Sequence, residues 1–522
     1  MTTAEPLDEQ LPPAAPLDEE ELRQLSRLRR WGTVGGLLMM IGSTSSYGAA
    51  TPVPNPVDGN RLLGLMSRLS TSALATSYAG MGLLVMSWLL IGRLATPGRV
   101  RRLSRSQLSH TLAMWTVPFL VTPPIFSRDV YSYLAVGSMA VNGFNPYDSG
   151  PYDVLGDRDV FAHQVDARWQ HTPTPYGPVY LLIARSIVSV TGQHVVAGVL
   201  LQRLVELVGV AAIIWALPRL ARRCGIDPVA ALWLGALNPL VLFHLIAGGH
   251  NEALMLGAML AGLVVALDRS WVAGVAIVTI GVAVKATAAM ALPFLVIALA
   301  LRRSPGWREL GRQAVLVASI ALGTFAIVSW IAGYGFGWIA GLGAPGSVRS
   351  FLSLTTSMGV GAGRIGILLG LGDHSAAAIS VMQPLGTLAG ALVAVGIMWQ
   401  TWRGRLEPIV GLGLALGAFV LLGPVIQPWY LLWAALPLAA AGADRRFRAV
   451  AVAITAGYAL IIMPNGGTIP PFTIASAVAV AAIVTGLGLF MLWRTGLPRA
   501  RPPGSQAPGS PVTVHTSYPR VS

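Results

Sequence analysis

Long apolar segments alternate with short polar connections along almost the whole chain. Apolar runs of about 15 to 25 residues recur between Trp31 and Trp493, and a helix of about 20 apolar residues can cross the hydrocarbon core of a bilayer. The runs are continuous and lack the alternation of apolar and polar positions that a membrane barrel needs. The pattern therefore predicts an all-α fold, a polytopic transmembrane helical bundle of about 13 to 14 spans.

The positions of arginine orient the predicted bundle. Arginines gather in short connections such as 93–105 and 219–227, and connections rich in Arg and Lys face the cytoplasm. This orientation puts two long segments, 128–177 and 333–375, on the external face of a membrane that we take to be the plasma membrane. Long segments without a fold of their own are usually functional or disordered, and the many aromatic residues of 128–177 favour a functional role.

The two ends of the chain differ from this middle part. Residues 1–22 are acidic and rich in proline, without an apolar period, and such a segment cannot bury enough surface to fold. The last residues are rich in arginine and proline. We therefore predict a disordered cytoplasmic tail at 1–22, a transmembrane domain at 23–496 and a second disordered cytoplasmic tail at 497–522.

Composition narrows the class of protein further. The chain is 54% hydrophobic and only 11% charged, which excludes an ordinary soluble protein. A net charge of +14 would suit a nucleic-acid-binding domain, but these arginines lie between spans, so we expect no nucleic-acid partner. Cys224 is the only cysteine, and neither a disulfide framework nor a thiolate metal site is expected.

The first external segment opens with the sequence FSRDVYSYLAVGSMAVNGFNPY, residues 126–147. Apolar residues recur at helical spacing after Asp129, which predicts a short helix lying along the membrane interface with Asp129 in its first turn. Aspartate commonly caps helices, and a carboxylate at a membrane surface can equally have a functional role. The spacing alone leaves both interpretations open.

Further candidates for chemistry lie on the same predicted face. Lys285 is the only lysine and interrupts an apolar run. An ionisable group in a span usually has a partner or a function, so Lys285 either binds a phosphate or pairs with Glu252 or Glu206. Arg349 could bind a phosphate through its planar fork or face solvent and lipid headgroups. His250 and Glu252 begin a span, where Glu252 favours the positive end of the helix.

Three other patterns are weaker signals. The triplet DRD at 157–159 has the D-x-D form that can hold a divalent ion on a nucleotide sugar, but a match of this length often arises by chance. The sequence QPWY at 427–430 could stack on a sugar ring or simply anchor the end of a span. The spacing of His244, His250 and Glu252 fits no established metal-ligand pattern, and we predict no metal site.

Motifs spread over most of the chain resemble one group of membrane enzymes. They are SRDVYSYLA at 127–135, TPTPYGP at 172–178, ALWLGALNPL at 231–240, HLIAGGHNEALMLG at 244–257, GYGFGWI at 333–339, VRS at 348–350, GILLGLGDH at 366–374 and QPWYLLWA at 427–434. Together they resemble the GT-C class of membrane glycosyltransferases. Within that class they are similar to the actinobacterial polyprenol-phosphomannose-dependent α-(1→6)-mannosyltransferases of lipomannan assembly, the MptB type.

The resemblance implies an activity and a set of site residues. The activity is inverting transfer of mannose from polyprenyl-phosphate-mannose to a lipid-anchored mannoside acceptor at the membrane lipid surface, with formation of α-(1→6) links. Asp129 would be the general base, kept ionised by Arg128. Lys285, Arg349 and Arg128 would bind the donor phosphate. The resemblance implies neither a metal nor another cofactor. The substrate-binding residues would be Tyr131, Tyr176, His250, Glu252 and Trp429.

Two other classes of protein stay open at this point. Another GT-C enzyme that uses an arabinosyl or glucosyl polyprenyl phosphate would share almost every feature described above. A lipid or sugar transporter would predict internal repeats and paired charges at mid-membrane depth, and the sequence shows neither.

Overall fold

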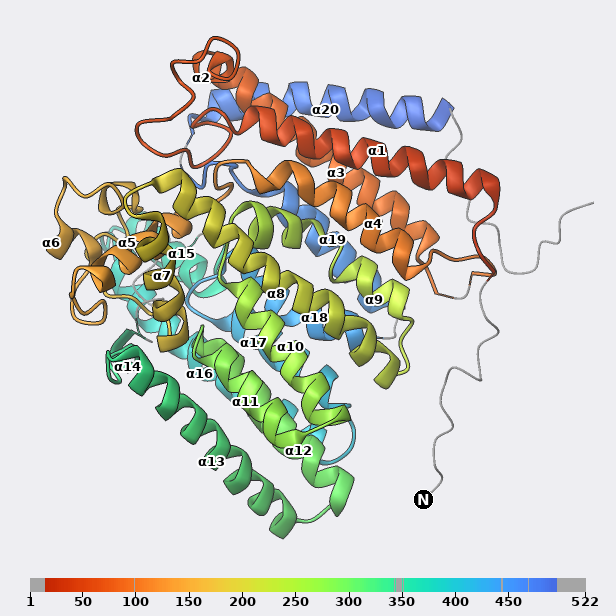
Figure 1. Cartoon of the computed structure of the whole chain (residues 1–522), viewed down its shortest axis with the longest axis vertical. Helices are drawn as coiled ribbons and strands as arrows, with labels where there is room; N and C mark the ends of the chain where they lie inside the picture. Colours follow the sequence, from red (N-terminus) through yellow and green to blue (C-terminus); the bar gives the residue numbers. More distant parts are fainter. Residues whose placement is uncertain are drawn as a thin grey trace, which may run out of the picture.

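The computed structural model describes residues 15–97, 99–341, 343, 350, 352–442, 445–467 and 469–494. Within these residues the fold is all-α, as predicted, and the only β-type pairing is an isolated bridge between Ala15 and Arg101. The long helices lie side by side in one bundle (Figure 1). One end of the bundle carries α5, α6 and α7 with their connections (Figure 1), and we call it the loop end.

The helices follow one another along the chain with few long connections. In the first part they are α1 (Glu19–Gly42), α2 (Leu65–Arg68), α3 (Ser70–Leu94), α4 (Arg105–Thr116), α5 (Asp129–Val141), α6 (Pro151–Leu155), α7 (Pro178–Thr191), α8 (Val195–Arg223), α9 (Pro228–Leu234), α10 (Glu252–Asp268), α11 (Trp271–Val282) and α12 (Ala291–Arg303). In the second part they are α13 (Trp307–Ala332), α14 (Trp338–Gly341), α15 (Leu354–Leu368), α16 (Ser375–Trp402), α17 (Pro408–Leu422), α18 (Leu431–Ala441), α19 (Arg445–Ile461) and α20 (Pro471–Arg494). Short irregular helices are η2 (Val117–Leu120), η3 (Ala162–Gln164), the π-helix η4 (Val241–Ala247), η5 (Ala286–Met290) and η7 (Pro428–Tyr430).

Fewer helices than predicted are long and apolar enough to cross a membrane. In the described part of the chain there are six, or seven if the bent pair of η4 and α10 counts as one span. Four further apolar helices have only 10 to 17 residues. Two of the apolar runs are broken: η4 and α10 meet at an angle of 111°, and Lys285 separates α11 from η5.

The boundaries of the predicted tails and loops need two corrections. Helix α1 begins at Glu19, inside the range assigned to a tail, because Asp18 and Glu21 form a capping box and their carboxylates pair with Arg101 and Arg99. Residues 1–14 and 497–522 lie outside the described residues. The predicted external loop 333–375 is not a loop throughout, since it contains α14 and the whole of α15.

Helix α5 also differs from its prediction. It begins at Asp129, as expected, but all residues from Val130 to Ala140 are buried, so other segments cover the helix on all sides. The reason is that α6, α7, α8 and η3 all pack against it. The segment that follows α5 thus folds back over the polar face that the pattern assigned to water.

A buried arginine holds the centre of the bundle at the loop end. Arg203 on α8 is 1% exposed, and its guanidinium donates hydrogen bonds to the carbonyls of Ile246 at 3.0 Å, Ala247 at 2.9 Å and Leu120 at 2.9 Å. Two of these carbonyls end the π-helix η4, where the chain turns toward His250. Arg203 therefore fixes the turn that precedes α10.

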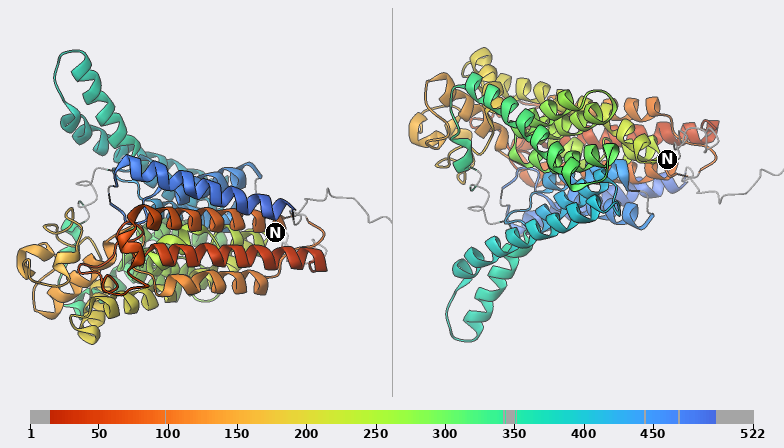
Figure 2. Two further views of the ribbon diagram at one scale, coloured as in Figure 1. Left: turned by 90° about the horizontal axis from the view of Figure 1, so that it is seen from above. Right: turned by 90° about the horizontal axis from the view of Figure 1, so that it is seen from below.

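One helical hairpin departs from the bundle. Figure 2 shows α15 and the first part of α16 projecting sideways from the body at the loop end. Most of the large side chains exposed on this hairpin are apolar, among them Leu368 at 84% and Leu388 at 58% exposure. An apolar surface of this kind is typical of contact with lipid.

Replacing Arg203 by lysine should lower the free energy of unfolding by about 2 to 4 kcal/mol. A single ammonium cannot reach three carbonyls at once, and buried carbonyls without a donor are costly. Thermal unfolding of the purified protein in detergent checks this, with Arg222→Lys on the exposed side of the same helix as the control. An equal Tm for the two variants would contradict the assigned role of Arg203.

Candidate active site

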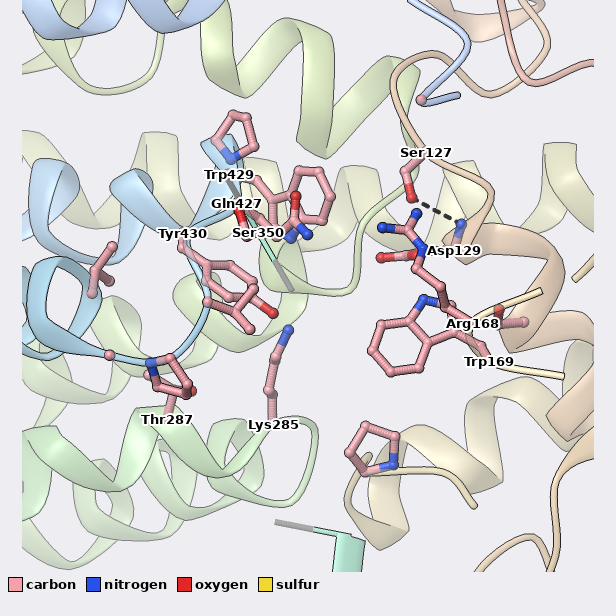
Figure 3. Close-up of a pocket in the computed structure, with 18 of the residues that line it drawn as sticks. Ser127, Asp129, Arg168, Trp169, Lys285, Thr287, Ser350, Gln427, Trp429 and Tyr430 are labelled. Atoms are coloured by element: carbon pink, nitrogen blue, oxygen red, sulfur yellow. Dashed lines mark hydrogen bonds between the residues drawn. The ribbon is translucent and has the colours of Figure 1, made fainter. Parts of the chain in front are cut away.

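A cavity of about 940 Å³ opens at the loop end of the bundle. Its walls come from segments far apart in the sequence. Most of the lining residues belong to 126–136, 168–176, 285–290, 419–433 and 461–474. Asp129, Arg168 and Trp169 lie on one side, Tyr430 lies on the other, and the Lys285 side chain lies between them (Figure 3).

The wall that carries Asp129 is one face of α5. Asp129, Ser132 and Val136 line the cavity because positions i, i+3 and i+7 share a helix face. Phe126, with a φ of 75°, turns the chain into this helix, a backbone conformation that is uncommon for a residue other than glycine. The Asp129 backbone N–H donates to Ser127 Oγ at 3.0 Å (Figure 3).

The Asp129 carboxylate does not cap its helix. Arg128 is the N-cap residue of α5, and no side-chain capping hydrogen bond forms there. The Asp129 side chain is 19% exposed, and its Oδ2 lies 3.5 Å from Nδ1 of His250. Of the two interpretations that the spacing left open, the structure therefore does not support capping.

Lys285 lies at the break between α11 and η5. The chain leaves α11 there, and the N–H groups of Gly177 and Val179 donate to the carbonyls of Val284 and Ala283 at 3.1 and 3.0 Å. A Cβ on Gly177 would come within 2.3 Å of the Ala283 carbonyl oxygen, so only glycine permits this close approach. The end of the first external segment thus holds the lysine in place.

The Lys285 ammonium pairs with a carboxylate and is surrounded by aromatic rings. Its Nζ forms an ion pair with Glu252, whose side chain is 0% exposed. The ring centroids of Tyr430, Trp433 and Tyr176 lie 5.0, 5.5 and 5.9 Å from Nζ, within the range of cation–π attraction. The Lys285 side chain is 17% exposed and lines the cavity. Pairing with Glu252 was one sequence-based alternative, and the structure shows it together with access to the cavity.

His250 and Glu252 stand in a layer behind the cavity wall. Both are 0% exposed, and neither lines the cavity. His250 Nδ1 lies 4.0 Å from Glu252 Oε2, and its ring stacks on Trp429 with centroids 3.9 Å apart. The predicted role of these two residues in direct substrate binding is therefore not supported, because they are covered by residues that do line the cavity.

Two more predicted site residues point elsewhere. The Arg128 guanidinium donates to the backbone carbonyls of Gln164 and Thr51 and to the Gln164 side chain, and it lies over the ring of Tyr131. The Tyr131 hydroxyl donates to the Ala50 carbonyl at 2.7 Å. Neither residue lines the cavity, so the phosphate-binding role of Arg128 and the substrate-binding role of Tyr131 are not supported. Arg349 lies outside the described residues.

Arg168 and Trp169 are cavity residues that the sequence reasoning missed. Arg168 lies beside Asp129 on the same side of the cavity (Figure 3), and its guanidinium donates to both carboxylate oxygens of Asp166 at 2.8 and 3.0 Å. Burial alone would raise the pKa of Asp166, but the hydrogen bonds and positive charge of Arg168 outweigh it and lower that pKa. The adjacent pair of arginine and tryptophan in the aromatic external segment was the available signal.

The weak D-x-D signal has a structural explanation. Asp159 accepts hydrogen bonds from the N–H groups of Phe161 and Ala162 at 2.9 and 2.8 Å and so caps the turn that leads into η3. Asp157 and Asp159 line a separate cavity of about 450 Å³ and not the one with Asp129. Among the described residues, no group of three or more His, Cys, Asp or Glu side chains is arranged to hold a metal ion.

The cavity combines three kinds of functional group: a carboxylate, an ammonium group and aromatic rings. Asp129 is a partly exposed carboxylate that can accept a proton. Lys285 supplies positive charge that can stabilise an anion, and Trp169, Tyr176 and Trp429 supply aromatic surfaces. These features suit a reaction in which a hydroxyl group loses its proton while an anionic group departs.

Comparisons with known proteins match this chain over nearly its full length. Residues 29–301 match the model of the N-terminal domain of the alpha-(1->6)-mannopyranosyltransferase family, and residues 355–490 match the MptB C-terminal domain. A probable alpha-(1->6)-mannopyranosyltransferase of Mycolicibacterium smegmatis is 42% identical, over 95% of this chain and 94% of the relative. No protein of known structure matches the chain.

Two further relatives carry the same kind of name. An alpha-(1->6)-mannopyranosyltransferase of Mycobacterium tuberculosis is 41% identical, over 93% of this chain and 90% of the relative. Alpha-(1->6)-mannopyranosyltransferase B of Corynebacterium glutamicum is 36% identical, over 92% of this chain and 84% of the relative.

Replacing Glu252 by glutamine should lower the free energy of unfolding by about 3 kcal/mol, because it leaves the Lys285 charge without its buried partner. The double variant Glu252→Gln/Lys285→Met should recover most of that loss, since it removes both charges. Thermal unfolding of the wild type, the two single variants and the double variant forms a complete cycle. Additive losses in the double variant would contradict an energetically coupled pair.

Proposed function

The chain belongs to the family of alpha-(1->6)-mannopyranosyltransferases, and on that premise we propose that it is a membrane glycosyltransferase that uses polyprenyl-phosphate-mannose. It transfers the mannose, with inversion, to a lipid-anchored mannoside acceptor and forms the α-(1→6) links of a lipomannan-type mannan backbone. The observation that carries the proposal is that one cavity holds both the Asp129 carboxylate and the Lys285 ammonium.

Asp129 is the general base of the proposed reaction. As the new bond forms between the acceptor oxygen and C1 of mannose, Asp129 takes the hydroxyl proton. The bond between C1 and the phosphate oxygen breaks, and its electron pair stays on the phosphate. Ser127 fixes the backbone of Asp129, and the Arg168 side chain lies beside the carboxylate (Figure 3).

Lys285 binds the departing phosphate. Its ammonium has three N–H donors; one is directed to Glu252, and the exposed part of the side chain faces the cavity. Because Glu252 and three aromatic rings restrict the ammonium, its charge is already in place when the phosphate gains charge. Such preorganised charge lowers the barrier more than a mobile group would.

The acceptor sugar fits on the side of the cavity that holds Asp129. Trp169 lies on this side (Figure 3), and aromatic faces commonly contact the apolar faces of sugar rings. A mannoside resting on Trp169 would direct a hydroxyl toward Asp129 (Figure 3). The acceptor and the donor phosphate would then approach the reaction centre from opposite sides.

The donor's isoprenoid chain fits the apolar part of the cavity. Phe419 and Val420 on α17 and Ile461 and Ile474 on α19 and α20 line this part. Ile461 is 56% exposed although it is apolar, which suits a wall open toward the membrane. The cavity thus combines a polar reaction centre with a route for a lipid chain.

The proposal places the reaction at the external face of the plasma membrane and without a metal ion. The arginine-rich connections, such as those with Arg102 and Arg223, pair with Asp227 and Asp268 at the end of the bundle opposite the loop end, and arginine-rich connections favour the cytoplasm. A lipid phosphate carries no nucleotide diphosphate that would need a divalent cation to leave.

Asp129→Asn should lower kcat for mannose transfer by about a hundredfold or more, because the amide cannot accept the proton. The assay uses labelled polyprenyl-phosphate-mannose and a short α-mannoside acceptor in membranes, with EDTA present. Asp148→Asn, which changes an exposed carboxylate of the same segment bonded to Asn145 at 2.9 Å, should keep full activity.

Three outcomes of this assay would each contradict one part of the proposed reaction. Near-normal transfer by Asp129→Asn would remove Asp129 from the role of base. Transfer by the wild type that disappears with EDTA would contradict metal independence. Transfer of arabinose or glucose, but not mannose, from the corresponding polyprenyl phosphates would keep the enzyme class and contradict the sugar.

Ile461→Asn should raise KM for a long-chain polyprenyl donor about tenfold, which corresponds to about 1.4 kcal/mol of lost lipid contact. KM for a donor with a short isoprenoid chain should not change, because that chain does not reach the apolar wall. Leu460→Asn is the matched control, since Leu460 is 41% exposed on the same helix but does not line the cavity. Equal effects on both donors would contradict the assigned lipid route.

A further inference from the structure

The QPWY motif at 427–430 places a tyrosine hydroxyl in the cavity beside Lys285. Tyr430 ends η7 and lines the cavity, and its side chain is directed toward the Lys285 ammonium (Figure 3). The Tyr430 hydroxyl has no hydrogen-bond partner among the described residues. The hydroxyls of Tyr131 and Tyr147, by contrast, donate to backbone carbonyls at 2.7 and 3.0 Å, as buried tyrosines usually do. The Tyr430 hydroxyl is therefore free to bind a ligand in the cavity.

Aromatic contacts hold the Tyr430 ring in this position. The ring stacks on that of Trp433, with centroids 4.2 Å apart and an angle of 25° between the planes. The Trp429 ring meets it edge-on at 5.9 Å, and Trp429 itself stacks on the buried His250. Lys285 Nζ lies 5.0 Å from the Tyr430 ring centroid. Because this packing fixes the hydroxyl, the donor needs no rearrangement when a ligand in the cavity gains charge.

The proposed reaction needs more at this place than the Lys285 ammonium. The donor phosphate carries one negative charge while it is linked to mannose, and it gains a second when the bond to C1 breaks. The charge of Lys285 is already balanced by Glu252, so the pair has no net positive charge to offset this gain. Arg168 lies on the other side of the cavity, next to Asp129 (Figure 3). A hydrogen-bond donor beside the ammonium can supply the additional stabilisation.

We propose that Tyr430 is a catalytic residue that donates a hydrogen bond to the departing phosphate. A phosphate group has several strong acceptor oxygens, so one oxygen can bind Lys285 Nζ while another accepts from the Tyr430 hydroxyl. As the bond between C1 and oxygen breaks, its electron pair stays on the phosphate, and the hydrogen bond from Tyr430 strengthens with the growing charge. The phenol keeps its proton, because a phosphate is a far weaker base than a phenolate. This role rests on the proposed function, which supplies the phosphate.

Tyr430→Phe tests this role, because it keeps the ring and its stacking and removes only the hydroxyl. In the mannose-transfer assay kcat should fall by about tenfold to a hundredfold, while KM for the donor should change by less than about threefold. The reason is that the hydrogen bond gains its strength only as the phosphate gains charge. The Tm in detergent should not change, because the hydroxyl has no partner in the described part of the protein.

Tyr152→Phe is the matched control. Tyr152 is also half-buried at the loop end, and its hydroxyl also has no hydrogen-bond partner among the described residues, but it does not line the cavity. This variant should keep the kcat of the wild type.

Product binding gives a second measurement, which does not depend on turnover. Affinity for polyprenyl phosphate, measured from the ligand-dependent rise in Tm of the purified protein, should fall about tenfold in Tyr430→Phe, because the product carries the full charge that the hydroxyl contacts. Affinity for the uncharged polyprenol of the same chain length should be equal in the wild type and the variant.

The outcomes separate this role from the proposed function. Wild-type kcat in Tyr430→Phe, or an equal loss of affinity for polyprenyl phosphate and polyprenol, would overturn the catalytic role of Tyr430. A higher KM with unchanged kcat would also overturn it, since the hydroxyl would then bind the donor and the transition state equally. In each of these cases, mannose transfer by the wild type would leave the proposed function standing. A wild type that neither binds polyprenyl phosphate nor transfers mannose would contradict the proposed function itself.

Discussion

The ion pair between Glu252 and Lys285 is the interaction on which the rest of the site depends. Glu252 is 0% exposed and Lys285 is 17% exposed, and charges in such surroundings are tolerated only when they are paired. Each of the two residues lies where a helix is broken, Glu252 after the bend between η4 and α10 and Lys285 after α11. Their attraction therefore ties two breaks together and brings polar groups to one depth in an apolar bundle.

Neighbouring contacts make this arrangement rigid. Arg203 binds the carbonyls at the end of η4, and the backbone of 177–179 binds the turn before Lys285. On α8 and α10, Gly209 and Gly257 let the two backbones approach so closely that a Cβ on Gly257 would lie 2.5 Å from the Gly209 carbonyl oxygen. Close helix contacts through small residues are common in membranes. The part of the cavity around Lys285 and Glu252 is therefore polar and rigid, and another part of its wall is apolar.

Sequence reasoning found the features that depend on local pattern and chemical type. The apolar runs predicted an all-α bundle, and the spacing after Asp129 predicted a helix that begins there. The rarity of lysine pointed to Lys285, with Glu252 and Glu206 as alternative partners, and the structure shows the pair with Glu252. Sequence reasoning failed where distant segments decide the outcome. Arg128 is the neighbour of Asp129 in the sequence, but its guanidinium turns away and binds Gln164. Arg168, some forty residues later, lies beside Asp129 instead. The burial of α5 and the broken spans were also invisible, because both result from packing between segments that no periodicity connects.

In the proposed reaction Lys285 and Asp129 face the same reaction centre, and the lipid chain leaves between α17 and the pair α19 and α20. The most direct measurement is a cryo-electron microscopy structure of the protein with polyprenyl phosphate bound. We expect the phosphate within hydrogen-bond distance of Lys285 Nζ, the isoprenoid chain along Val420 and Ile461, and Asp129 across an open space the size of a sugar ring. A phosphate bound away from Lys285, or a chain that leaves the cavity by another wall, would contradict this expectation.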